Sequence, residues 1–139
     1  MPFVLDCSVT MSWVFSDEGT NDTTELLESL VDDVAIVPQI WTLEVANVLL
    51  VAGRRGRIDA GDRPHLVAAL NALPIEVDRE TSDHALVGTL GLAAEQDLSA
   101  YDAAYLELAL RRKLPMATLD RRLARACRAA GVELVFSVE

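Results

Sequence analysis

The chain has 139 residues, 51% of them hydrophobic, so it is long and apolar enough to fold around a core of its own. Its formal net charge of −10 argues against a general nucleic-acid coat protein. No apolar stretch has the length of a membrane span, and the N-terminus lacks the basic leader of a secretory signal. Cys7 and Cys127 form neither a metal-binding pair nor a disulfide framework, so we expect a cytoplasmic protein.

The charge is unevenly distributed. Residues 100–139 carry seven basic and five acidic side chains, a net charge of +2, whereas the rest carries five basic and 17 acidic ones, a net charge of −12. The basic C-terminal segment is able to bind a phosphate backbone locally, and a cluster of acids that binds divalent cations would add to the negative excess. Charge alone does not decide between these interpretations.

Short apolar runs alternate with helical patterns along the whole chain. The expected strands are 3–5, 35–38, 75–77 and 116–119, with a closing strand over 132–136. The expected helices are a short one capped by Ser8 and reaching residue 15, then 20–30, 40–52, one opened by Asp59 or Asp62 and reaching 73, 82–95, 100–112 with Ser99 as its cap, and 120–130. This alternation predicts an α/β fold: a three-layer α/β/α sandwich around a mostly parallel sheet of four to five strands, in a single domain over 1–139.

Four acids are placed where they can act together. Asp6 and Asp120 each follow a strand and precede a helix, and Asp102 lies in the first turn of its helix. Glu44 lies on a helix that is apolar on every side, so we expect it to be largely buried, and Asn47 is one turn away on the same face. The carboxyl ends of parallel strands meet at one edge of the sheet, where such folds bind their ligands.

Each acid also has a purely structural explanation. Asp120 can cap the last helix, Ser99 and Asp102 fit a capping box, and Asp6 can close an Asx-turn. Glu44 can pair with an arginine, but this explanation is separate from the capping and turn roles that account for the three aspartates. All four being structural is therefore the weaker hypothesis.

Carboxylates that meet in this way need a counter-charge. Two of them about 4 Å apart repel by roughly 4 kcal/mol at an effective dielectric constant of 20. Such a group either takes up protons or recruits a cation. An acidic site of oxygen ligands, without cysteine or a well-placed histidine, suits Mg²⁺ or Mn²⁺ better than zinc. His65 and His84 lie in helical stretches with ordinary neighbours and are interpreted as surface or packing residues.

Four segments carry a family resemblance. They are Val4-Leu5-Asp6-Cys7-Ser8, the run from Pro38 to Asn47, Leu98-Ser99-Ala100-Tyr101-Asp102-Ala103-Ala104-Tyr105, and Ala117-Thr118-Leu119-Asp120-Arg121-Arg122-Leu123. In order, spacing and total length they resemble the PIN domain, and more closely the VapC toxins of bacterial toxin–antitoxin pairs. The resemblance covers essentially the whole chain.

The resemblance implies an Mg²⁺- or Mn²⁺-dependent endoribonuclease with a cognate antitoxin partner and often a homodimer. It implies a metal and catalytic site made of Asp6, Glu44, Asp102 and Asp120, with the Ser8 and Thr118 hydroxyls and Asn47 beside it. Cleavage would leave a 5′-phosphate and a 3′-hydroxyl. Some relatives carry a further acid near the position of Asp120, where this chain has Arg121 and Arg122, so one or two ions remain possible. Asp97 matches no motif.

Contacts to the RNA substrate are open at this stage. Arg54, Arg55 and Arg57 on a glycine-rich turn, and Arg121, Arg122 and Arg125 beside Asp120, are candidate phosphate clamps, although a solvated or salt-bridged basic face explains either group equally well. Trp13, Phe15 and Trp41 belong either to the core or to a groove that receives an antitoxin helix.

Two other functions are kept as alternatives. The run from Asp6 to Thr10 weakly resembles the haloacid-dehalogenase phosphatases, with Asp6 as the nucleophile, but their second aspartate is replaced by Ser8 and the single lysine, Lys113, lies at a helix end. The second alternative is a catalytically silent PIN-like module that only binds its partner.

Overall fold

The sheet consists of four short parallel strands in the order β3-β2-β1-β4. In a computed structural model, which describes residues 1–138, the strands are β1 (Phe3–Leu5), β2 (Ala35–Val37), β3 (Ile75–Val77) and β4 (Met116–Ala117). Val4 at the centre of the sheet pairs with Ile36 on one side and with Met116 on the other. Both faces of β1 and β2 are buried, as their continuous apolar runs predict.

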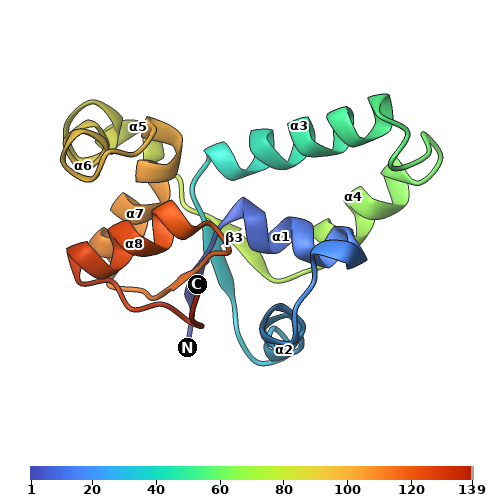
Figure 1. Ribbon diagram of the computed structural model, residues 1–139, viewed down its shortest axis with the longest axis horizontal. Coiled ribbons are helices and arrows are strands. Elements are labelled where there is room, and N and C mark those ends of the chain that lie inside the picture. Colours follow the sequence, from blue (N-terminus) through green and yellow to red (C-terminus); the bar gives the residue numbers. More distant parts are fainter. Residues whose placement is uncertain (139) are drawn as a thin grey trace.

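Helical segments connect the strands and cover both faces of the sheet. They are α1 (Cys7–Val14), the 3-10 turn η1 (Ser16–Glu18), α2 (Asn21–Ser29), α3 (Ile40–Arg54), α4 (Arg63–Asn71), α5 (Thr81–His84), the π-helical segment η2 (Ala85–Thr89), α6 (Leu90–Gln96), α7 (Ala100–Arg112) and α8 (Arg121–Ala130). Figure 1 shows α1–α4 on one side of the sheet and α5–α8 on the other. The fold is thus the predicted three-layer α/β/α sandwich, with four strands.

The observed strands differ from the predicted ones near the C-terminus. The fourth strand was expected to reach Leu119, but it ends at Ala117. Beyond it, the Thr118 hydroxyl donates to the Asp6 carboxylate and the Leu119 amide donates to the Ser8 hydroxyl, so the ladder does not continue. The closing strand over 132–136 is also wrong, because only an isolated parallel bridge between Leu134 and Met116 forms there.

Helix starts follow local capping chemistry, with one correction. Thr20 caps α2 through reciprocal bonds with Thr23, and Ser99 accepts the amide hydrogen of Asp102 at the start of α7. The expected cap Ser8 lies inside the first turn of α1, which begins one residue earlier, and its hydroxyl bonds to Asp6 instead. The single helix expected over 82–95 is divided into α5, the π-helical segment η2 and α6.

Helix α3 is less buried than its composition predicts. Trp41, Val45 and Leu49 belong to the core, but Leu43 is 68% exposed and Leu50 is 37% exposed. An apolar stripe of α3 therefore faces outward and is free to contact another molecule. None of the helices among residues 1–138 is long and apolar enough to cross a membrane.

Candidate active site at the carboxyl edge of the sheet

Asp6 is the most buried of the four predicted acids. It follows β1, its amide donates to the carbonyl oxygen of Ala117 at 3.0 Å, and the residue is only 5% exposed. Two hydroxyls, those of Ser8 (2.6 Å) and Thr118 (2.7 Å), donate to the same carboxylate oxygen, Oδ2. The other oxygen, Oδ1, accepts no hydrogen bond from residues 1–138 and is not among the fully buried polar atoms that lack a partner, so it reaches solvent. Asp6 thus keeps one oxygen for a ligand.

The turns after β1 and β4 are joined by their side chains. The amide of Leu119 donates to the Ser8 hydroxyl at 2.9 Å, and the amide of Asp120 donates to the Thr118 hydroxyl at 3.0 Å. Asp120 caps α8, since its Oδ1 accepts the amide hydrogen of Leu123 at 2.9 Å. Asp120 therefore does cap its helix, as its structural explanation predicts. Capping uses only one of its two carboxylate oxygens, and the other oxygen is not used by the cap.

Glu44 enters the site from α3 and is held from α7. The hydroxyl of Tyr105, which is fully buried, donates to Glu44 Oε1 at 2.6 Å. Asn47 was expected to orient this glutamate, but its side chain is exposed and lies beside a different cavity. The role of Tyr105 does not follow from the sequence motif alone, although its position one helical turn after Asp102 places both residues on the same face of the helix.

Burial and the charges of neighbouring acids raise the pKa values of Asp6 and Glu44. Burial raises the pKa of Asp6 to about 6; the Ser8 and Thr118 hydroxyls oppose this, and the charges of Asp102 and Asp120 add to it. Burial also raises the pKa of Glu44, where Tyr105 opposes the shift and Asp6 and Asp102 increase it.

Asp102 belongs to the same electrostatic group. Its pKa is raised by burial and then by Asp120, and it is lowered by Ser99 and Arg122. The reciprocal capping box expected for Ser99 and Asp102 does not form, because only the Asp102 amide is bonded. The Asp102 carboxylate is therefore not used to cap its own helix.

The donor chemistry fits a hard divalent cation. Among residues 1–138, no three acid, histidine or cysteine side chains lie close enough to enclose an ion in this conformation. Mg²⁺ does not require such a cage, because it usually binds one or two carboxylates and keeps several of its waters. The free oxygen of Asp6, surrounded by acids with raised pKa values, matches that mode of binding.

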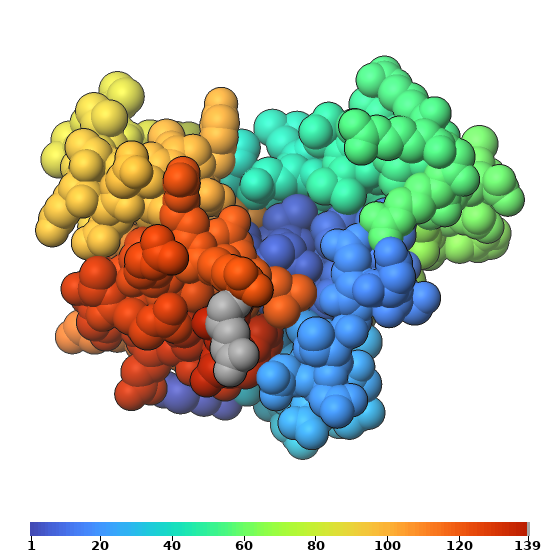
Figure 2. Space-filling view, viewed as in Figure 1, coloured from blue at the N-terminus to red at the C-terminus, as the bar shows by residue number. Residues whose placement is uncertain are grey.

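The site lies in a hollow of the surface. In Figure 2, the dark-blue atoms of the N-terminal segment form the floor between α3 and the orange and red segments of α7 and α8. Arg121 and Arg122, at the start of α8, are both exposed, and Arg122 is near enough to lower the pKa of Asp102. Asp97 is exposed and adopts the left-handed conformation that ends α6.

Other predicted residues have definite structural partners. Arg57, expected as a phosphate clamp, is ion-paired with Asp17 at 2.6 Å and with Glu18 at 2.8 Å. Trp41 is a core residue whose indole N–H donates to Thr10. Phe15 is buried, His65 is exposed, and half-buried His84 lies 3.6 Å from Glu80.

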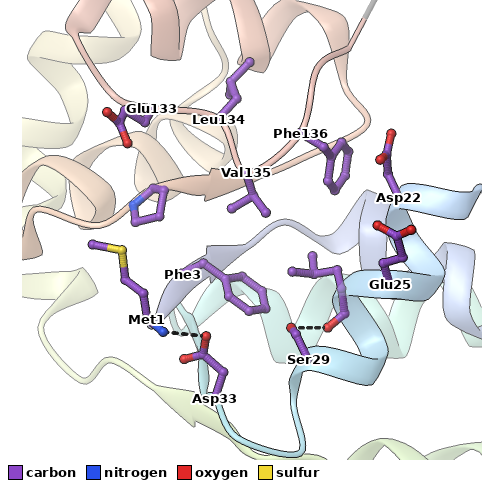
Figure 3. A pocket seen from close by; sticks show the side chains of 12 residues that line it. Met1, Phe3, Asp22, Glu25, Ser29, Asp33, Glu133, Leu134, Val135 and Phe136 are labelled. Atoms are coloured by element: carbon purple, nitrogen blue, oxygen red, sulfur yellow. Dashed lines mark hydrogen bonds and ion pairs between the residues drawn. The ribbon is translucent and has the colours of Figure 1, made fainter.

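A separate cavity of about 460 Å³ lies near the opposite edge of the sheet (Figure 3). Its lining includes Phe3 at the start of β1 and Phe136 from the C-terminal segment. The N-terminal ammonium donates to Asp33 at 2.7 Å on its rim. Ligand crevices of open α/β sheets lie at the carboxyl ends of the strands, so this cavity is not the candidate active site.

Solved structures share this fold. One is a protein of Pyrobaculum aerophilum (24% identity, 91% of this chain and 87% of that chain, TM-score 0.63). Another is a toxin–antitoxin complex from Klebsiella pneumoniae (16% identity, 98% of this chain and 99% of that chain, TM-score 0.60). A third is VapBC2 from Rickettsia felis bound to a DNA fragment from its promoter (10% identity, 96% of this chain and 97% of that chain, TM-score 0.66).

The family is established by sequence. No curated protein matches the chain. The sequence model of the PIN domain, however, matches residues 3–129, a range that includes all four acids and both hydroxyls that bind Asp6. The chain therefore belongs to the PIN domain family.

Proposed function

We propose that this chain is a Mg²⁺- or Mn²⁺-dependent endoribonuclease and the toxin of a toxin–antitoxin pair. One observation carries the proposal: buried Asp6 keeps one carboxylate oxygen without a hydrogen-bond partner among residues 1–138, and the charges of Asp102 and Asp120 add to the rise of its pKa. Asp6 and Asp102 in turn add to the rise of the pKa of Glu44. Membership in the PIN domain family supports a nuclease, and two of the structural neighbours are toxin–antitoxin complexes or members of such pairs.

The proposed roles follow from the contacts. Asp6 would bind the ion through its free oxygen, and Asp102, Asp120 and Glu44 would hold it directly or through its bound waters. The ion would supply Lewis acidity and a more acidic bound water for phosphodiester hydrolysis. Ser8 and Thr118 keep Asp6 Oδ2 in place and leave Oδ1 for the ion. Tyr105 fixes the direction of Glu44.

RNA would approach between two groups of arginines. Arg121, Arg122 and Arg125 are exposed on α8, next to Asp120. Arg54 and Arg55 are exposed at the far end of α3. None of these five forms an ion pair within residues 1–138, so all are available to phosphates.

A groove between α1, α2 and α4 fits an apolar segment of an antitoxin. It has a volume of about 160 Å³ and is lined by Trp13, Val14, Leu27, Leu66, Ala69, Leu70 and Leu73. Trp13 is half-buried there, with its indole N–H already bonded to the carbonyl oxygen of Thr23, so only its apolar surface is available. Amphipathic helices bind apolar grooves of this kind. We propose that the toxin forms a homodimer. We also propose that the toxin and its antitoxin act in the cytoplasm.

Cleavage of RNA by the purified, antitoxin-free protein tests the proposal. Total RNA and transfer RNA are incubated with Mg²⁺ and, in parallel, with a chelator. Asp6→Asn and Asp102→Asn should lower the rate at least about 100-fold, because an ion held at a reacting phosphate contributes several kcal/mol. Tyr105→Phe should lower it less, since Glu44 remains present.

Asp22→Asn, on the exposed face of α2, is the matched control and should cleave as the wild type does. Undiminished cleavage by the Asp6 and Asp102 variants would disprove the site, and cleavage in chelator would disprove the dependence on metal. A wild-type protein that binds RNA or antitoxin but never cleaves would be the silent binding module. A phospho-aspartyl adduct at Asp6 would instead revive the phosphatase.

A further inference from the structure

The guanidinium of Arg57 is held in one orientation by three neighbours. Its NH1 donates to Glu18 at 2.8 Å, its NH2 donates to both oxygens of Asp17 at 2.6 and 2.8 Å, and its Cζ lies 3.9 Å from the centre of the Phe15 ring. Two carboxylates already balance its charge, so it is a poor phosphate clamp. The side chain is nevertheless 40% exposed, and the planar face turned away from Phe15 is the surface that it still offers.

A cavity of about 250 Å³ adjoins this flat group. Its walls are Phe15, Asn47, Val48, Val51, Ala52, Arg55 and Arg57. The aliphatic side chains of α3 give it an apolar wall, whereas Asn47 supplies a carboxamide with both donors and an acceptor. A planar apolar ring with polar edges is the kind of group that such a wall, a carboxamide and a guanidinium face accept together.

The cavity lies farther along two helices that also contribute to the candidate active site. Asn47 lies one turn of α3 beyond Glu44, and Val51 is about 10 Å from Glu44 at a rise of about 1.5 Å per residue. Phe15 directly follows α1, the helix that begins beside Asp6. A strand whose phosphate lies at Asp6 is therefore close enough to place a neighbouring nucleotide here.

Charge favours a nucleotide over an apolar peptide side chain. Arg55 on the rim and Arg54 beside it are exposed and form no ion pair within the described part of the chain, whose net charge is strongly negative. A nucleotide brings its own phosphate to these cations, whereas an apolar side chain leaves them unused. Stacking on arginine planes is a common way for proteins to bind unpaired bases.

We propose that this cavity is a base-binding subsite: an unpaired base of the RNA stacks on the Arg57 guanidinium, Asn47 bonds to its edge, and Arg55 contacts the adjoining phosphate. The inference rests on the proposed ribonuclease function and names a subsite of that same enzyme. Arg57 is assigned to stacking and not to neutralising phosphate.

The test measures the base-dependent part of RNA binding. A fluorescent adenosine octaribonucleotide and an octamer of abasic ribonucleotides, which carries the same phosphates, are titrated with the full-length protein in chelator to prevent cleavage. The wild type should bind the adenosine octamer about tenfold or more tightly than the abasic one, within the range known for stacking of a base on a protein side chain. Arg57→Lys keeps the charge but removes the flat face, and Asn47→Ala removes the edge contacts. Both should lower the ratio of the two affinities several-fold.

Arg79→Lys is the matched control, since it makes the same chemical change at an exposed arginine outside the cavity and outside both groups of phosphate-binding arginines, and it should leave the ratio unchanged. Melting temperatures of all variants verify that each is folded, and exposed Asn47 lies outside the core. An unchanged ratio in both cavity variants, with Mg²⁺-dependent cleavage intact, would overturn the subsite alone. Wild-type protein that neither binds nor cleaves RNA would overturn the nuclease proposal and the subsite with it.

Discussion

At the scale of single residues, the carboxyl group of Asp6 reduces the stability of the metal-free protein. Burial raises its pKa in the folded state from 3.8 to about 6, so the unfolded chain releases this proton more readily. The cost is absent below about pH 3.8 and complete above about pH 6, where it reaches on the order of 3 kcal/mol. A bound cation removes the cost, which is consistent with a residue selected for binding and not for stability.

Asp6→Asn should therefore stabilise the protein in chelator, because the amide keeps the shape of the side chain without its charge. At pH 7.5 we expect a gain of up to about 3 kcal/mol in the free energy of unfolding, falling to about half of that at pH 5. Urea unfolding at both pH values measures this difference. Asp22→Asn, an exposed acid, is the control and should change little. An Asp6→Asn variant that is no more stable than the wild type at pH 7.5 would contradict the conclusion that burial raises the pKa of the Asp6 carboxyl.

Elements could be predicted from the sequence where local chemistry decides them. The strands 3–5 and 75–77, the cap Ser99, and the start of α8 after Asp120 follow from apolar runs and capping residues nearby in the chain. The absence of the closing strand over 132–136 could not be predicted, because whether a short apolar run pairs with the edge strand β4 depends on tertiary packing. The π-helical segment η2 likewise has no local signal in the sequence.

The acids of the site were predictable, but their partners were not. Asp6 and Asp120 stand out because each directly follows a strand. The Tyr105–Glu44 bond joins residues 61 positions apart, and the Arg57–Asp17 pair joins residues 40 apart. Neither pair has a periodicity or motif that links its members, so Asn47 was the nearest candidate for Glu44, and Arg57 was grouped with phosphate-binding arginines. Both pairs form because packing brings together residues that are far apart in the chain.

At the scale of elements, Arg111 connects α7 to the end of β3 through ion pairs. Its guanidinium binds Asp78 at the end of β3 at 2.7 Å and Glu107 at 2.8 Å, and all three side chains are largely buried. The Arg111 contact lowers the pKa of Asp78 below 3.8, so the pair stabilises the fold above that pH and loses its effect as the pH falls through the lowered pKa. This pair connects the edge strand to the helix that carries Asp102 and Tyr105.

Arg111→Met should lower the free energy of unfolding by about 3–5 kcal/mol at neutral pH, because the buried carboxylates of Asp78 and Glu107 lose their nearest cation. Urea unfolding at pH 7 measures the loss. Arg128→Met on α8 is the matched control, since that arginine is exposed and forms no ion pair among the described residues, and it should change stability by less than about 0.5 kcal/mol. Equal losses for the two variants would show that the Arg111 pairs contribute nothing specific.

At the scale of the whole molecule, apolar surface is concentrated on two neighbouring regions. Leu86, Val87 and Leu90 of η2 and α6 are 84%, 80% and 55% exposed, and Tyr101 at the start of α7 is 63% exposed. The outward stripe of α3, with Leu43 and Leu50, is the second region. Figure 1 shows α5–α6 and α3 on opposite sides of the sheet, both along the upper edge of the view.

A two-fold homodimer would cover both regions, because each copy's α6 patch could then meet the partner's α3 stripe in an isologous contact. A stable contact of this type buries about 1,600 Å² in total. Leu86→Lys combined with Val87→Lys places two charges in the predicted interface and should convert the protein to monomers in sedimentation velocity. Val31→Lys, at an isolated valine that is 87% exposed after α2, should leave the dimer intact. A wild type that sediments as a monomer at tens of micromolar would refute the dimer and leave this apolar surface to a different partner.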